Sequence, residues 1–139
     1  MISLIDYDVK ILLAFGQALK KNKKFFNWLM ENGYPELGAL SAAINSDAEA
    51  LQWLLKSKYP QFGVLSNAID GEENAFIWLK KNNCDFLLRF ALACRKDPDA
   101  IKWFIENNLK LFIQFIQMIH VILQQQIDES ADVHRRRIT

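Results

Sequence analysis

The fold is decided by residues 36–60, which read ELGALSAAINSDAEALQWLLKSKYP. Apolar residues spaced by three or four positions form two stripes, Leu37–Leu40–Ile44 and Leu51–Leu54–Leu55. This spacing is typical of one face of a helix. Between the stripes lies Asp47, a residue type that favours the N-terminus of a helix. The stretch therefore predicts two short helices joined by a tight turn, over about 36–45 and 48–58.

The same pattern returns along the chain with a period of 25 residues. All the tryptophans share this period: Trp28, Trp53, Trp78 and Trp103. A column of alanines does as well: Ala18, Ala43, Ala68 and Ala93. Self-similarity at a fixed period is the signature of a repeat architecture. The predicted repeats are 11–35, 36–60, 61–85 and 86–110, followed by a divergent segment over 111–127.

These repeats predict an all-α fold, a short α-solenoid of four to five antiparallel helix pairs. One helix pair cannot bury its wide apolar face alone, whereas a stack of pairs buries it continuously. We expect the small alanine column to let the first helices approach closely and the tryptophan column to fill the gap between neighbours. Trp53→Ala or Trp78→Ala would then cost about 3–5 kcal/mol. The predicted domain covers residues 1–127, and residues 128–139 are predicted to form a flexible basic tail.

Composition excludes several classes of protein. With 51% hydrophobic residues, the chain has the material for a packed core, which excludes intrinsic disorder. Its formal net charge of +1, from 17 basic and 16 acidic residues, provides no overall field for nucleic acid or anionic membranes.

The N-terminus does not resemble a secretory signal. The most apolar stretch, 111–123, is too short and too polar to span a bilayer. We therefore expect a cytoplasmic protein.

Residues 39–44 (ALSAAI) and 49–56 (EALQWLLK) resemble the helix pair of an ankyrin repeat. The likeness covers residues 11–110 and implies a curved stack whose concave face binds proteins. Ankyrin units are about 33 residues long and open with a Thr-Pro-Leu-His motif, which is absent here. The shorter period corresponds to an ankyrin repeat without its β-turn finger. No functional residue carries over, because that finger often makes the contacts in ankyrin proteins.

Residues that carry catalytic chemistry are sparse. His120 and His134 lack the spacing of a metal-binding pair. Cys84 and Cys94 have no CxxC spacing, and Cys94 falls in an apolar column that predicts a core position. Nucleophile-elbow, phosphate-loop and dinucleotide motifs are also missing. The sequence therefore predicts no catalytic, cofactor-binding or metal-binding residue and a chain that is not an enzyme.

Two features suggest partner-binding surfaces. The first is a cluster of four lysines around Asn22: Lys20, Lys21, Lys23 and Lys24. It is either a solvated turn or a site for an acidic partner. The second is the apolar segment 111–123, whose candidate contact residues are Phe115, Ile119 and Ile122. Such a helix is either covered within the chain or exposed as an interface. The exposed alternative predicts a homodimer through this final helix.

The leading hypothesis is a non-catalytic protein–protein interaction module, an ankyrin-like scaffold or adaptor. The sequence identifies neither the partner nor the binding face. One alternative is a nucleic-acid-associated adaptor that uses the lysine cluster and the arginines Arg135, Arg136 and Arg137. The other is an enzyme of unrecognised type.

Overall fold

The computed structural model describes the backbone of residues 1–138 and the side chains of residues 1–133. Every regular element within that part of the chain is a helix. Helix pairs are formed by α1 (Val9–Leu19) with α2 (Lys23–Glu31), α3 (Pro35–Ile44) with α4 (Ala48–Lys56), α5 (Pro60–Ile69) with α6 (Glu73–Lys81), and α7 (Asp85–Cys94) with α8 (Pro98–Glu106). A short 3₁₀ helix, η1 (Leu4–Asp6), precedes them, and the long helix α9 (Lys110–Ile138) follows. The predicted all-α repeat fold is confirmed.

Local signals explain the boundaries of the helix pairs. The Asp47 side chain accepts hydrogen bonds from the backbone N–H groups of Glu49 and Ala50, and so caps the start of α4. Pro35 and Pro60 begin α3 and α5, where a missing N–H costs no helical hydrogen bond. The turn inside each pair passes through a residue with positive φ, at the 25-residue period: Lys21, Ser46, Gly71 and Lys96.

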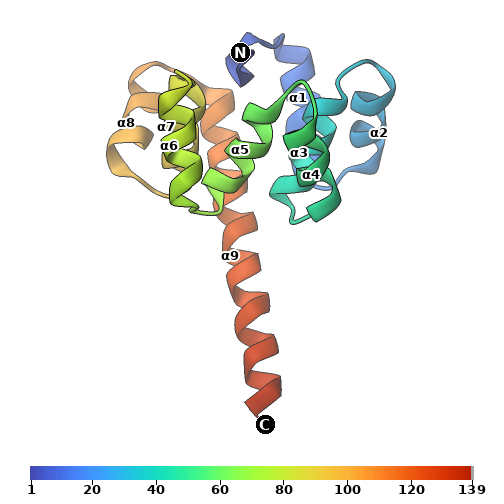
Figure 1. The fold of residues 1–139 in the computed structure, drawn as a ribbon, viewed down its shortest axis with the longest axis vertical. Coiled ribbons are helices and arrows are strands. Elements are labelled where there is room, and N and C mark those ends of the chain that lie inside the picture. Colours follow the sequence, from blue (N-terminus) through green and yellow to red (C-terminus); the bar gives the residue numbers. More distant parts are fainter. Residues whose placement is uncertain (139) are drawn as a thin grey trace.

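The pairs are arranged as an arc with an inner and an outer layer (Figure 1). The inner helices α1, α3, α5 and α7 pack side by side in chain order. The outer helices α2, α4 and α6 each pack on the inner helix of their own pair and on the next inner helix, and α8 packs on α7 and α9. The alanine column belongs to the inner helices and is buried at all four positions: Ala18, Ala43, Ala68 and Ala93.

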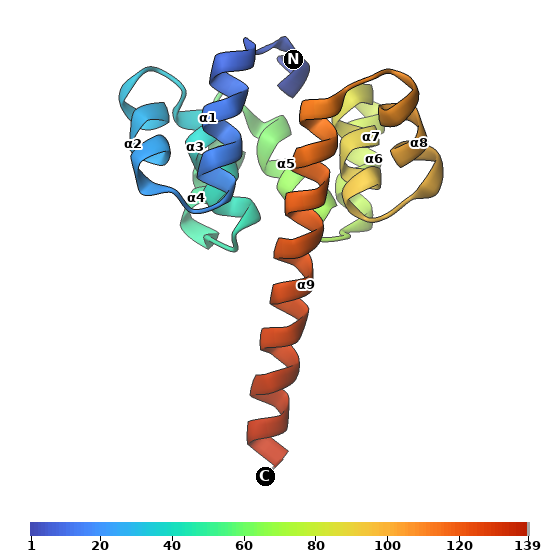
Figure 2. The same cartoon turned by 180° about the vertical axis from the view of Figure 1, so that it is seen from behind.

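Helix α9 lies between α1 and α7 and closes the arc (Figure 2). On the first-repeat side, the Phe115 ring meets the Phe15 ring edge to face, with centroids 5.4 Å apart. On the fourth-repeat side, Phe112 meets Phe86 at 4.9 Å. The Gln126 side chain donates to the Ile44 carbonyl (3.1 Å) and to the Ser46 hydroxyl (2.7 Å). The divergent fifth segment is therefore one helix that joins the two ends of the stack.

The N-terminal segment is fastened to the other end of the inner helices. The Tyr7 hydroxyl donates to the buried Glu36 carboxylate at 2.9 Å. The Gln61 side chain, also buried, donates to the Ile2 carbonyl at 3.0 Å. Burial, with the Glu36 carboxylate adding to it, raises the pKa of Tyr7, so the phenol keeps its proton and remains a donor.

The tryptophan column does not fill the gaps between repeats, and this prediction is wrong for two of its members. Trp28 is 40% exposed and Trp53 is 45% exposed. Trp78 and Trp103 are half-buried. The outer helices pack on inner helices rather than on one another, which leaves Trp28 and Trp53 partly open to solvent. Trp103 instead packs on Phe86, and the Arg89 guanidinium lies 4.5 Å from its ring centre. The residue that follows each tryptophan is fully buried: Leu29, Leu54, Leu79 and Phe104.

The end of the chain also differs from its prediction. Residues 128–138, predicted as a flexible tail, continue α9 as a helix that projects away from the repeats (Figures 1 and 2). This segment, which we call the stalk, contains neither glycine nor proline, so no residue type interrupts the helix. The side chains of residues 128–133 are all exposed. The predicted contact residues Arg135, Arg136 and Arg137 lie outside the described side chains.

Candidate protein-interaction groove

A groove runs between α9 and the first two repeats. Its volume is about 510 Å³. It is lined by Leu19, Lys20, Lys21, Asn45, Met118, Val121, Ile122 and Gln125. We call it the α9 groove.

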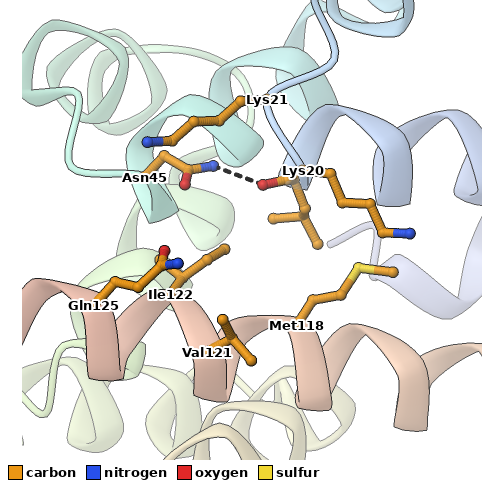
Figure 3. A pocket seen from close by; sticks show the side chains of 8 residues that line it. Lys20, Lys21, Asn45, Met118, Val121, Ile122 and Gln125 are labelled. Atoms are coloured by element: carbon orange, nitrogen blue, oxygen red, sulfur yellow. Dashed lines mark hydrogen bonds between the residues drawn. The ribbon is translucent and has the colours of Figure 1, made fainter.

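Two sequence-distant segments form the α9 groove (Figure 3). Met118, Val121 and Ile122 of α9 provide an apolar floor. Lys20 and Lys21 stand on the opposite rim, at the turn after α1. This rim is braced from the second repeat, because the Asn45 side chain donates to the Leu19 carbonyl at 3.1 Å.

The groove presents positive charge beside apolar surface. Lys20 and Lys21 are exposed, and within residues 1–133 neither forms an ion pair. None of the described residues that line the groove is acidic. Val121 is 57% exposed, although it lies in the floor. This combination suits a segment that carries carboxylates next to apolar side chains, because charge complementarity steers and orients the partner.

The structure brings together residues from both predicted partner surfaces. Lys20 and Lys21 come from the lysine cluster, and Ile122 comes from the apolar final segment. Lys24 lies elsewhere, in a shallow hollow beside Trp28. Lys23 is exposed and lines neither hollow. The lysine cluster is thus divided between two surfaces.

Two predicted partner-binding residues are not available to a partner. Phe115 and Ile119 are both 0% exposed, because α9 turns this face toward the inner helices. The prediction that these two residues form an interface is therefore wrong. The sequence reasoning also missed Met118, Val121 and Gln125 as groove residues. Their positions on the same side of a helix as Ile122 were visible in the sequence, but they do not reveal which side of an almost wholly apolar helix faces outward.

Residues that often carry catalysis have structural roles here. His120 Nε2 lies 2.9 Å from the Ala93 carbonyl and links α9 to α7. The described residues hold no group of His, Cys, Asp and Glu side chains suited to a metal ion. Cys84 is largely buried, and Cys94 is 1% exposed.

Cys94 is expected to resist thiol reagents as long as the chain is folded. Burial raises the pKa of its thiol, and the reactive species is the thiolate. In a Cys84→Ser variant, labelling of Cys94 by a disulfide reagent should follow the fraction unfolded across a urea titration. Full labelling within the native baseline would contradict the buried position of Cys94.

The fold and the groove define the class of this protein: an all-helical repeat protein whose stack is closed by a terminal helix. Searches of protein-family models, of curated proteins and of solved structures found no match to the chain. Among the described residues, no helix has the length and apolar character needed to cross a membrane.

Proposed function

We propose that the chain is a non-catalytic protein–protein interaction module and that the α9 groove receives an acidic, partly apolar segment of a protein partner. The observation that carries this proposal is the placement of Lys20 and Lys21 across from a partly exposed apolar floor, formed by the exposed Val121 and the half-buried Met118 and Ile122. Aromatic or aliphatic anchors on such a segment would occupy the floor, and its carboxylates would face the lysines. A cytoplasmic location and an ankyrin-like mode of action, through the concave side of a curved stack, belong to the same proposal.

The physical support is that a rigid scaffold holds both halves of the groove. Asn45 fixes the lysine-bearing turn, while Gln126 fastens α9 to the second repeat next to the floor. A preformed groove loses little conformational entropy when a partner binds. The floor residues project from a helix that is packed on both ends of the stack, so they are also held in place.

Reversal of the rim charges should abolish partner capture. The test uses the full chain as bait in lysate of its source cells and compares the wild type with a Lys20→Glu, Lys21→Glu variant. A Lys80→Glu, Lys81→Glu variant is the matched control, because it makes the same charge change at two exposed lysines of α6. We expect a protein retained by the wild type and the control to be reduced on the order of tenfold or more by the rim variant, since each lost charge pair is worth about 1 kcal/mol.

The captured protein should then bind the purified chain through an acidic segment, with affinity that falls as salt rises. Equal capture by all three baits would exclude the groove as the binding site. Capture that disappears after nuclease treatment would favour the nucleic-acid adaptor instead, with a salt dependence set by phosphate contacts.

A further inference from the structure

The helix face that forms the groove floor continues along the stalk. Its members recur at spacings of three or four residues: Met118, Val121, Ile122, Gln125, Asp128, Glu129 and Asp132. Residues at these spacings share one side of a helix. One continuous face of α9 therefore runs from inside the groove out to the exposed stalk.

The two halves of this face lie beside opposite charges. The half within the groove is apolar and lies beside Lys20 and Lys21. The part of the stalk next to the repeats carries the acidic residues Asp128, Glu129 and Asp132, all exposed, whereas its arginines, Arg135 to Arg137, follow further along the chain. Residues 128–132 therefore offer carboxylates to the lysines beside the groove of another copy.

The face is also symmetric about Gln125. Positions 122 and 128 are equally far from residue 125, as are positions 121 and 129, and positions 118 and 132. If two α9 helices cross antiparallel at Gln125, the acidic positions 128, 129 and 132 of one copy lie along the groove half of the other copy, beside its Lys20 and Lys21. One two-fold axis then places each stalk over the groove of the other copy, so the same surface patch is used twice.

The described side chains of the stalk gain no burial from the repeats. Residues 128–133 are all exposed, and the hydrogen bond that Gln124 donates to Asp128 at 3.0 Å is local to the helix. Most helical stability in proteins comes from packing. Docking on a second copy would provide the missing contacts and would cover Val121.

We propose that a second copy of this chain occupies the α9 groove, with the acidic residues Asp128, Glu129 and Asp132 of each copy lying antiparallel in the groove of the other. This inference rests on the proposed function in one respect, the preference of the groove for carboxylates beside Lys20 and Lys21. It replaces dimerisation through Phe115 and Ile119 with dimerisation through an exposed face of the same helix. It also means that an external partner competes with the second copy for the groove.

The test is the absolute mass in solution, measured by light scattering over a concentration series for four full-length chains. The wild type and the Lys80→Glu, Lys81→Glu control should be dimers. A groove variant (Lys20→Glu, Lys21→Glu) and a stalk variant (Asp128→Lys, Glu129→Lys, Asp132→Lys) should each be monomers, because each places like charges across both halves of the interface. All substitutions lie at exposed positions, so circular dichroism should show unchanged helix content in the repeats.

Mixing the two monomeric variants gives the decisive result. In the mixture, the acidic groove of the groove variant meets the basic stalk of the stalk variant. The native groove of the stalk variant meets the native stalk of the groove variant. We expect the mixture to form a dimer that neither variant forms alone. A wild type that is monomeric at every concentration would overturn the inference, as would a dimer that survives both charge reversals. Neither result affects the proposed function, which is decided separately by capture of a partner with the rim variant.

Discussion

Phe115→Ala is expected to lower the free energy of unfolding by about 3–5 kcal/mol, the range for truncating a large aromatic side chain in a core. Phe115 is 0% exposed and lies outside the four helix pairs, so the effect measures what closure of the stack contributes. Its ring meets Phe15 edge to face at 5.4 Å and Phe112 at 5.6 Å. Truncation would leave a cavity between the first repeat, the fourth repeat and α9.

Urea denaturation followed by helical circular dichroism would measure this change. Ile127→Ala is the matched control in the same helix, because Ile127 is 61% exposed, lies away from the groove face, and its truncation should change stability by no more than about 0.5 kcal/mol. If Phe115→Ala proved as mild as Ile127→Ala, α9 would not be packed between the ends of the stack.

The helix pairs were predictable because their causes are local. Asp47 caps a helix through its own neighbours, and Pro35 favours a first turn by its fixed φ. The 25-residue period repeats these signals, with side-chain caps also at Asn22 and Asp97 and a second proline at Pro60. Burial of the alanine column follows from the same argument, since small residues at a fixed position allow close packing of helices.

Closure by α9 was not predictable from the period, because it depends on how strongly the stack curves. A weak signal was present in the column that contains Gly16, Ser41, Ser66 and Ala91, all of which are small and buried. A Cβ atom on Gly16 would lie only 2.8 Å from the Phe115 ring, so a small residue is required where the ring packs. The sequence shows the small residue but does not show which aromatic side chain needs it.

The groove illustrates the same limit. Lys20, Lys21 and Ile122 were candidate contact residues, but they belonged to two separate predicted surfaces. The tertiary fold brings them together in one groove, although about 100 residues separate the turn after α1 from the floor on α9. Such a long-range contact does not follow from local periodicity. Phe115 and Ile119 show the converse, since an apolar helix read alone does not reveal which of its sides is already covered.

Leu54→Ala is expected to destabilise the chain far more than Trp53→Ala, although tryptophan is the larger side chain. Leu54 is 0% exposed and Trp53 is 45% exposed, so the leucine substitution creates a cavity and the tryptophan substitution removes mainly surface contacts. The expected costs are about 2–5 kcal/mol for Leu54→Ala and about 1 kcal/mol or less for Trp53→Ala. The two residues are adjacent in α4, so both variants change helix propensity and local context in nearly the same way.

Urea denaturation of both variants, read by circular dichroism, gives the comparison. A larger loss for Trp53→Ala would mean that the tryptophan column packs between repeats, as the period alone suggests.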